Sequence, residues 1–440
     1  MFYGWWDARF LILIAFTTFC SFGSGILLEK KEGDRNLQKW ISVANILLNL
    51  LILAIFKYYN FFAENLTQLF LTFGLQLDWV TLDILLPVGI SFYTFQALSY
   101  TIDVYQHKMK PTHDIVAFFA FISFFPQLVA GPIERATHLL PQFLRSRSFD
   151  YAKATDGMRQ ILWGLFKKLV IADNCAVAVN QIFENYYQHD GLTLFYGAVL
   201  FTFQIYGDFS GYSDIAIGTA RLFGINLMRN FNFPYFSRDI AEFWRRWHIS
   251  LSSWLRDYLY ISLGGNRHGK FRQYLNLIIT MFLGGLWHGA SWNFVLWGMF
   301  HGVALALHKA WMTIIGRKKG EESHGVRRFL GVIITFNFVC FCWIFFRNAD
   351  IHNSMDMLGQ IFTTFRPQLF PQLLEGYWRV FALMALGFLL HFAPDSWENA
   401  VCRGVIRLPF LGKALLMVAM IYLVIQMKSS EIQPFIYFQF

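Results

Sequence analysis

One histidine near the end of a long apolar run is the first candidate for chemistry. His288 stands in the segment Gly284-Gly285-Leu286-Trp287-His288-Gly289-Ala290. An ionisable side chain in a membrane-spanning helix is costly and indicates function by default, and an imidazole can take and return a proton near neutral pH. Counted from Arg272, a straight helix would put His288 about 24 Å along its axis, toward the outer side. The alternative is a structural histidine, and the flanking glycines would leave room for a substrate or for a close helix contact.

A second histidine lies among arginines. Residues 242–260 carry tryptophan and leucine at i, i+3 and i+4 spacing, which predicts one amphipathic helix at the membrane interface or against the bundle. His248 falls on its apolar side, and the polar side chains around it are Arg245, Arg246, Arg256 and Asp257. A histidine that caps or bridges at the interface is the structural alternative.

A third polar group interrupts an apolar run of nearly 30 residues. Asp208, Ser210, Ser213 and Asp214 lie within the segment 206–214. This pattern predicts a kinked helix that lines a cavity, whereas the alternative is a helix break that is satisfied internally. The segment offers too few ligands for a metal and has no histidine nearby in sequence, so no metal site is expected.

The composition indicates which elements must position these residues. The chain has 440 residues, of which 56% are hydrophobic, 19% aromatic and 15% charged, whereas soluble domains carry about 25% charged residues. Disorder, an ordinary cytosolic enzyme and a nucleic-acid-binding module are therefore excluded. Eleven apolar runs are candidate spans, some of them short or broken: residues 10–28, 40–56, 82–104, 115–130, 161–183, 192–220, 274–287, 292–311, 329–346, 380–392 and 410–426. We expect an all-α polytopic membrane protein with about 10–11 transmembrane helices plus re-entrant and amphipathic segments, in one domain over residues 1–440.

The basic residues predict the orientation in the membrane, because Lys and Arg collect in cytoplasmic loops. Basic clusters at residues 30–39, 108–110, 135–153, 238–272, 317–328 and 403–413 are expected to be cytoplasmic. Residues 115–130 have basic segments on both sides, so we expect them to be re-entrant, with a break at residues 129–132. Lys413 precedes the last span, and the tail 431–440 with Tyr437 should therefore emerge outside.

Taken together, the motifs resemble those of membrane-bound O-acyltransferases. The resemblance rests on Arg245-Arg246-Trp247-His248-Ile249-Ser250-Leu251, Trp254-Leu255-Arg256-Asp257-Tyr258-Leu259-Tyr260, Leu263-Gly264-Gly265-Asn266-Arg267, Trp287-His288-Gly289-Ala290, Asp208-Phe209-Ser210-Gly211-Tyr212-Ser213-Asp214 and Ala130-Gly131-Pro132-Ile133. The most similar branch is bacterial and acts in alginate, cellulose or peptidoglycan O-acetylation, alongside the lipoteichoic acid D-alanylation transporter. The resemblance covers the chain from about residue 86 to its end. It implies a funnel-shaped fold with a thin centre, His288 as the catalytic histidine and His248 as its supporting residue.

The resemblance extends to the C-terminal tail. Phe435-Ile436-Tyr437-Phe438-Gln439-Phe440 resembles a short tyrosine motif linked to acyl relay in this branch, where a partner peptide can carry it. An aromatic belt at the membrane interface is the alternative. On the relay interpretation, Tyr437 is a transient acyl acceptor that reaches His288 from the outer side.

These observations lead to the hypothesis of acyl transfer across the membrane. A cytoplasmic thioester, acetyl-CoA or an acyl-carrier protein, would present the acyl group, and His288 would act as general base on a hydroxyl. Arg245, Arg246 and Arg256 would hold the phosphates of the donor, and His248 or Asn293 would donate to the oxyanion.

The remaining expectations concern partners and location. Asp257, Asp208 and Ser210 complete the candidate binding residues. No bound cofactor is expected, and an extracytoplasmic O-acetyltransferase of the SGNH-hydrolase type is the expected protein partner. The chain should be a multi-pass protein of the cell inner (cytoplasmic) membrane.

Two other classes of function remain open. A transporter or flippase of a glycan precursor would also need many spans, but the segment 208–214 has no second copy in the chain, whereas transporters often consist of paired halves. A non-catalytic subunit that docks a secreted transferase would make His288 and His248 dispensable.

Overall fold

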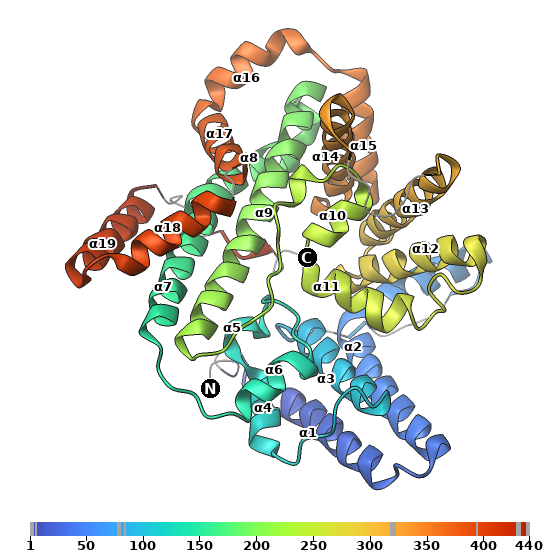
Figure 1. Ribbon diagram of the computed structural model, residues 1–440. Coiled ribbons are helices and arrows are strands. Elements are labelled where there is room, and N and C mark those ends of the chain that lie inside the picture. The colour runs from blue at the N-terminus through green and yellow to red at the C-terminus, as the bar shows by residue number, and fades with distance from the viewer. Residues whose placement is uncertain are drawn as a thin grey trace. The chain divides into compact units, whose positions relative to one another are not determined.

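The computed structural model describes residues 4, 7–76, 81–82, 85–316, 323–392, 395–427 and 433–436. Its helices are labelled in Figure 1. The described residues form α-helices, two π-helical segments and short 3-10 turns, without a β-strand among them. Several of the helices are long and apolar. The predicted class, an all-α polytopic membrane protein, is confirmed.

The chain forms two compact units, residues 1–148 with 225–228, and residues 149–224 with 229–440. The helices of the first unit are α1 (Arg9–Lys30), α2 (Arg35–Thr72), α3 (Ile90–Tyr105), α4 (Ile115–Ser123), α5 (Phe125–Leu128) and α6 (Ala136–Phe143). Those of the second unit are α7 (Tyr151–Leu165), α8 (Asp173–Glu184), α9 (Gly191–Leu222), α10 (Ile240–Arg246), α11 (Ile249–Trp254), α12 (Gly269–His288), α13 (Trp292–Ile314), α14 (Gly325–Arg347), α15 (Ile351–Thr363), α16 (Phe370–Gly376), α17 (Trp378–Phe392), α18 (Asp395–Arg407) and α19 (Phe410–Met427). The π-helical segments are η2 (Phe166–Ala172) and η5 (Leu255–Tyr260), and the 3-10 turns are η3 (Tyr186–Gln188), η4 (Pro234–Phe236) and η6 (Pro367–Leu369). A single domain over residues 1–440, and the funnel shape, stay predictions.

Fewer helices meet the requirements of a membrane span than the apolar runs suggested. Within the described ranges, α1, α2, α14 and α19 are long and apolar enough, and the bent pair Pro367–Gly376 and Trp378–His391 makes a fifth if it forms one span. Some of the other runs fold as short helices, such as α3 with 16 residues. Others contain charges and small polar residues, as α9 does with Asp208, Ser210 and Asp214. Length and composition therefore do not support the expected number of about 10–11 spanning helices.

The first unit contains the segment that was expected to be re-entrant. Residues 115–130 form α4 and α5, and each is too short to cross a bilayer. Helix α5 ends at Leu128, so the break expected at residues 129–132 is confirmed. A further break falls at Phe124, because Pro126 lies in the first turn of α5, where proline begins a helix but cannot continue one. Residues 225–228 belong to this unit, since the buried carboxylate of Glu134 accepts a hydrogen bond from the backbone N–H of Met228.

In the second unit, α9 is the central helix, with most of its side chains buried. It runs as one α-helix from Gly191 to Leu222, so the segment 206–214 does not break it, and the predicted kink stays a prediction. The polar side chains of that segment bond to Lys167 and Lys168 of η2, to Asn230 and to Ile436. Figure 1 shows α7 beside α9, and the two backbones approach closely because a Cβ on Gly164 or Gly211 would overlap the carbonyl oxygen of the other.

The predicted single amphipathic helix over residues 242–260 is also wrong. It is divided into α10, α11 and the π-helical segment η5. Between α10 and α11, Trp247 is extended and His248 lies in the left-handed region with φ +43°. This break changes the chain direction and leaves the His248 side chain completely buried.

Candidate active site

His288 is the last residue of α12 and lies in a nest of aromatic rings. The centroid of its ring is 5.0 Å from that of Trp297, 5.1 Å from that of Phe346 and 5.1 Å from that of Trp287. The side chain is almost fully buried, with 9% of its surface exposed. The predicted apolar setting of His288 is confirmed.

Close packing of α12 against α13 fixes the position of this histidine. A Cβ on Gly285 would overlap the carbonyl oxygen of Phe294, and it would lie 3.1 Å from the Cα of Gly298. Small residues let helix backbones approach in membranes, where van der Waals packing drives helix association. Of the two roles considered for the glycines beside His288, the structure shows the close helix contact. Gly285 therefore sets the distance between α12 and α13, and with it the distance between the His288 imidazole and the ring of Trp297.

His248 is held by Asn230, a residue that the sequence did not single out. The Oδ1 atom of Asn230 lies 3.1 Å from His248 Nδ1 and accepts hydrogen bonds from the backbone N–H of Ser250 at 3.3 Å and from its hydroxyl at 2.9 Å. The Nδ2 atom of Asn230 in turn donates to Ser213 Oγ on α9 at 3.2 Å. The backbone donor at Ser250 identifies Oδ1 as an acceptor, so Nδ1 of His248 must donate to it. The proton of a neutral imidazole is then on Nδ1, and Nε2 is the basic nitrogen.

Burial keeps His248 neutral. The imidazole is completely buried, and this lowers its pKa to about 3. Within the described part of the chain, Nε2 has no hydrogen-bond partner. In this state Nε2 can accept a hydrogen bond but cannot donate one, which disfavours His248 as the donor to an oxyanion.

Trp287 connects the two histidines. The centroid of its ring lies 5.1 Å from that of His288 and 6.2 Å from that of His248. On the other side of His248, the ring of Phe209 from α9 makes an edge contact at 4.6 Å. The structure thus brings together the two histidines that the sequence proposed, from α12 and from the break between α10 and α11.

The three candidate arginines differ in their ion pairs and in their exposure to solvent. Arg246 is structural, since its guanidinium forms an ion pair with Glu242 at 2.8 Å. Arg256 pairs with its neighbour Asp257 at 2.6 Å and is exposed. Arg245 is exposed and has no ion pair among the described residues. Arg245 is therefore the arginine that is most available to an incoming phosphate.

Glu242 is the carboxylate that organises α10. It accepts from Arg238 Nε at 2.7 Å and from Arg246 at 2.8 Å. Burial alone would raise its pKa, but the hydrogen bonds and charges of Arg238 and Arg246 outweigh burial and hold the pKa of Glu242 below its usual range.

Asp208 and Ser210 belong to an ionic cluster with two lysines of η2. Asp208 pairs with Lys168 at 2.8 Å, and Lys168 also pairs with Asp173 at 2.7 Å. The Nζ atom of Lys167 donates to Ser210 Oγ on α9 at 3.0 Å. It also forms an ion pair with Asp214, which is on α9 too. Lys167 and Lys168 were missed, although two lysines inside the apolar run 161–183 are a signal for buried partners.

The C-terminal tail returns to this cluster. The backbone N–H of Ile436 donates to Asp208 Oδ2 at 2.7 Å, and Lys168 donates to the carbonyl of Gln433 at 3.3 Å. Ile436 is completely buried, and the ring of Phe435 is 6.3 Å from that of Phe209. Residues 433–436 thus reach the aromatic ring that also contacts His248. Tyr437 lies outside the described residues.

Asn293 and His301 extend the region around His288. Asn293 is completely buried, donates to the carbonyl of Asn348 at 2.7 Å and accepts from Ser354 at 3.4 Å, so both ends of its amide have partners. His301 was missed by the sequence interpretation. It is buried against Trp297 at 4.7 Å and accepts a hydrogen bond from Trp244 Nε1 at 3.3 Å. A histidine at helical spacing on an apolar face gave no signal that distinguished it from a core residue.

Within the described ranges, no group of three or more His, Cys, Asp or Glu side chains is arranged to hold a metal. The polar side chains that lie together are instead paired with lysine, arginine or amide groups. The chemistry that this arrangement supports is acid–base chemistry at imidazole in a largely apolar setting.

Comparison with known proteins gives the family. Residues 5–349 match the membrane-bound O-acyltransferase family, MBOAT. The chain is 42% identical over 364 residues to probable alginate O-acetylase AlgI of Pseudomonas aeruginosa, covering 82% of this chain and 68% of that protein. The protein of the same name from Pseudomonas putida is 37% identical over 462 residues, covering 100% of this chain and 92% of the relative. Peptidoglycan O-acetyltransferase of Helicobacter pylori is 34% identical over 390 residues, covering 81% of this chain and 71% of the relative.

The family match includes the segments that carry both histidines, the ionic cluster and the motif at residues 130–133. It decides between the classes of function that the sequence left open, since acyl transfer is the chemistry that names the family. The chain belongs to the membrane-bound O-acyltransferase family, and it is a multi-pass membrane acyltransferase.

Proposed function

We propose that this chain moves an acetyl group from cytoplasmic acetyl-CoA across the membrane for O-acetylation of an extracytoplasmic polysaccharide. Relatives named as alginate O-acetylase and peptidoglycan O-acetyltransferase support the acetyl group and a polysaccharide such as alginate or peptidoglycan as the final acceptor, and cellulose is a further candidate. The observation that carries the proposal is the pair of buried histidines joined by Trp287. The protein would act in the inner membrane with an extracytoplasmic partner of the SGNH-hydrolase type.

His288 is the proposed general base. It takes the proton from an acceptor hydroxyl, whose oxygen attacks the carbonyl carbon of the thioester. The C–S bond then breaks, and the proton returns from His288 to the leaving thiolate. His248 supports this step as a neutral hydrogen-bond acceptor through Nε2, in a position held by Asn230.

Arg245 and Arg256 are the proposed contacts for the phosphates of the donor. Both side chains are exposed, and Arg256 would exchange its bond to Asp257 for a phosphate. Arg246 is excluded from this role by its ion pair with the buried Glu242. Asp208 and Ser210, which were candidates for donor binding, are better explained as the residues that hold the tail and Lys167.

Tyr437 is proposed to receive the acetyl group before it passes to the partner. The support is the anchoring of Gln433 and Ile436 at Lys168 and Asp208, one aromatic ring from His248. Mass spectrometry of the C-terminal peptide should detect an acetyl adduct on Tyr437 in protein incubated with acetyl-CoA. Tyr437→Phe should lose the adduct and transfer, whereas Tyr422→Phe on the exposed surface of α19 should retain both. Full activity of Tyr437→Phe would exclude the relay.

The catalytic proposal is tested in a strain that lacks the chromosomal gene. Complementation with the natural chain should restore polysaccharide O-acetylation, and His288→Ala should lower it by about 10²- to 10⁴-fold, the usual contribution of a general base. His352→Ala is the matched control, because His352 is exposed in the first turn of α15. Unchanged acetylation with His288→Ala at normal expression would instead indicate a subunit that only docks a secreted transferase.

A further inference from the structure

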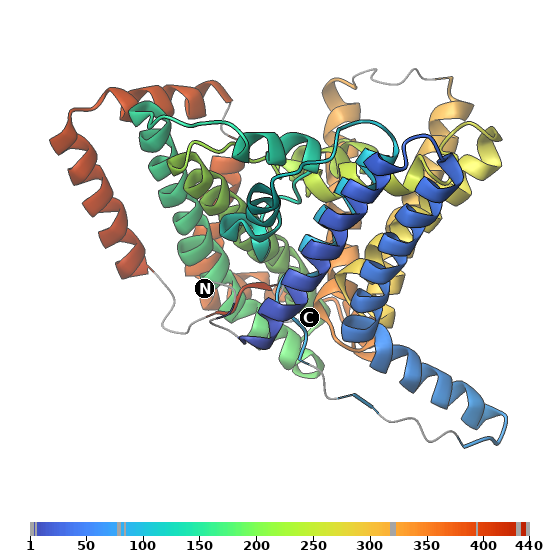
Figure 2. The same ribbon diagram turned by 90° about the horizontal axis from the view of Figure 1, so that it is seen from below.

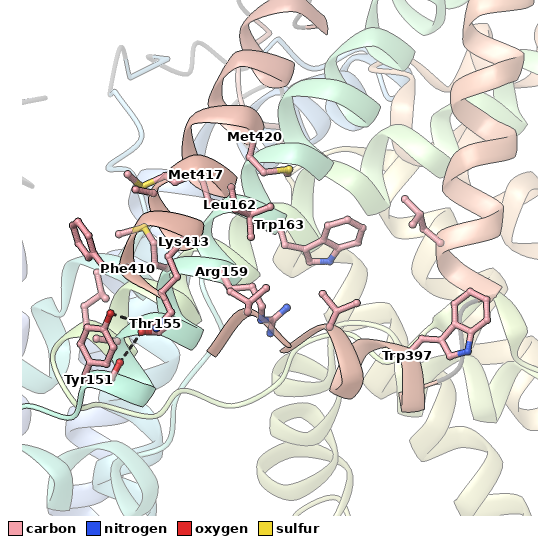
Figure 3. Close-up of a pocket in the computed structure, with 18 of the residues that line it drawn as sticks. Tyr151, Thr155, Arg159, Leu162, Trp163, Trp397, Phe410, Lys413, Met417 and Met420 are labelled. Carbon is pink, nitrogen blue, oxygen red and sulfur yellow. Dashed lines mark hydrogen bonds between the residues drawn. The ribbon is translucent and has the colours of Figure 1, made fainter. Parts of the chain in front are cut away.

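A cavity of about 830 Å³ lies among α7, α18 and α19 (Figure 3), and neither His248 nor His288 lines it. Three helices contribute most of its lining, each with a stripe of side chains at helical spacing. α7 provides Tyr151, Thr155, Met158 and Leu162, α18 provides Trp397, Val401 and Val405, and α19 provides Phe410, Lys413, Met417 and Met420. Figure 2 shows α18 across the ends of α7 and α19.

The lining has a polar end and an apolar end. Figure 3 shows Tyr151, Thr155 and Lys413 together at one end, where α7 and α19 begin, and Leu162 and Met420 further along the same helices. A lining that changes from charged to apolar along its length matches an amphipathic ligand whose head group and chain lie at opposite ends.

The length of the cavity matches one leaflet of a bilayer. Along α19 the lining runs from Phe410 to Met420, which is about 15 Å at 1.5 Å per residue, and along α7 it runs from Tyr151 to Trp163, about 18 Å. The hydrocarbon core of a bilayer is about 30 Å thick. A partner's transmembrane helix would need contacts along the whole length of α19, whereas a lipid chain needs only this half.

Lys413 supplies a positive charge at this end, and its partner in the described part of the chain is the ring and hydroxyl of Tyr151. Its Nζ atom is 3.3 Å from the hydroxyl of Tyr151 and 4.6 Å from the centroid of the same ring. Among the described residues, no carboxylate lies within ion-pair distance of Lys413. The second cation in the lining, Arg159, is already paired with Asp156 at 3.0 Å.

The surroundings of the polar end are basic. Arg403 and Arg407 on α18 are exposed, as is Lys153 on α7. These residues come from the two basic segments, 135–153 and 403–413, that the charge pattern assigns to the cytoplasmic side, and the contact between Lys413 and Tyr151 joins the two segments. Clusters of Lys and Arg at the cytoplasmic membrane surface attract anionic lipids.

We propose that this cavity binds an anionic phospholipid of the cytoplasmic leaflet, with its phosphate at Lys413 and Tyr151 and an acyl chain between α7 and α19. α19 has no buried residue in this chain, and the bound chain would supply the apolar contacts that α19 lacks along its α7 side.

The test is native mass spectrometry of the purified full chain titrated with phosphatidylglycerol or with phosphatidylcholine of identical acyl chains. The natural chain should retain phosphatidylglycerol preferentially. Lys413→Gln should lower that affinity about fivefold, the effect of one lysine near a membrane surface, and Lys413→Arg should retain it. Lys270→Gln, an exposed lysine in the first turn of α12, is the matched control and should leave the affinity unchanged.

A second variant tests the apolar half. Met417→Trp would fill the cavity between α7 and α19, and it should reduce binding of both lipids while the protein elutes as a single species on size-exclusion chromatography. Equal retention of the two lipids by the natural chain, or an unchanged affinity in Lys413→Gln, would overturn the proposal. A co-purified polypeptide that Met417→Trp releases would overturn it in favour of a partner helix.

Discussion

His288 and Asp208 are both buried in the same unit, but the neighbours of His288 are aromatic and those of Asp208 are charged or polar. Around His288 the neighbours are the rings of Trp287, Trp297 and Phe346. Around Asp208 they are the ammonium of Lys168 and the backbone N–H of Ile436. In the first region an imidazole, the proposed reactive group, lies in an apolar setting, whereas in the second each charge has an opposite charge or a donor beside it.

This difference separates chemistry from positioning. A group that must exchange protons during turnover needs a position that its neighbours fix. Breaking a buried ion pair instead costs stability, because removing one partner leaves an uncompensated charge in an apolar interior. Variants of the ionic cluster should therefore lose stability and activity together, and variants of the histidine region should lose activity first.

The largest effect on stability is expected at Asp208. Asp208→Asn leaves the charge of Lys168 with Asp173 alone and weakens the acceptor for the N–H of Ile436, and breaking a buried pair typically costs about 3–5 kcal/mol. Thermal unfolding in detergent should show a large fall in the melting temperature. Asp257→Asn, at the exposed pair with Arg256, is the control and should cost about 0–1 kcal/mol. An equal fall in melting temperature for the two variants would show that the buried ion pair of Asp208 stabilises the chain no more than the pair of Asp257 does.

The next effect is expected at the contact between α12 and α13. Gly285→Ala adds a Cβ where the carbonyl oxygen of Phe294 lies, and overpacking of this kind costs about 1–3 kcal/mol. Since α13 carries Trp297, acetyl transfer should also fall. The adjacent Gly284→Ala is the control, because its Cβ would meet only the flexible end of Leu255 at 3.1 Å. Acetyl transfer and melting temperature of both variants should be measured side by side.

A change at Asn230 should separate activity from stability most clearly. Asn230→Ala removes the acceptor for His248 Nδ1, and an unsatisfied buried donor costs about 1–3 kcal/mol, which corresponds to a loss of roughly 5- to 150-fold in transfer rate if the cost falls on the transition state. Asn230→Asp keeps an acceptor and adds a negative charge that favours the imidazolium, so the pH–rate profile should change shape relative to the natural chain.

The control for that position is Asn337→Ala, since Asn337 is exposed and its Nδ2 bonds only within its own helix at Ile333. It should leave the rate and the profile unchanged. A purely structural role of Asn230 would lower the melting temperature of Asn230→Ala and leave the pH profile of Asn230→Asp unchanged.

The smallest effect is expected at Glu242. Its pKa is lowered in the folded chain, so its contribution to stability is present above the unfolded pKa, near 4.3, and is lost as the pH falls through the lower folded pKa. Glu242→Gln retains an oxygen that can accept from Arg238 and Arg246, whose side chains are partly exposed, so the free energy of unfolding at pH 7 should fall by about 1 kcal/mol or less, and the melting temperature should fall with it. This difference should shrink below about pH 4. The exposed Glu375→Gln should show no such dependence.

The parts of the site that carry strong local signals could be predicted from the sequence. His288 follows two glycines in an apolar run, and the structure places it at a close helix contact among aromatic rings. His248 was expected on the apolar side of its segment, and it is completely buried. The positions of these side chains follow from burial, which composition and spacing encode directly.

The parts that depend on backbone direction and on distant partners could not be predicted. The tryptophan and leucine spacing continues across residue 248, so periodicity gave no sign of the left-handed turn that separates α10 from α11. Asn230 lies in the irregular segment after α9 and meets His248 only in the folded unit. The partners of the Asp208 carboxylate, Lys168 and Ile436, could not be predicted either, because they are far away from it in sequence.

The left-handed backbone of His248 is a strain that its own side chain compensates. A residue with a Cβ pays roughly 1–2 kcal/mol for this conformation, and glycine adopts it freely. Glycine here would nevertheless delete a completely buried ring, leave a cavity beside Phe209 and Trp287 and remove the bond to Asn230, and large-to-small core substitutions cost about 2–5 kcal/mol. Relaxing the backbone would therefore destabilise the chain, so selection for stability favours a side chain at this position even though its backbone conformation suits glycine.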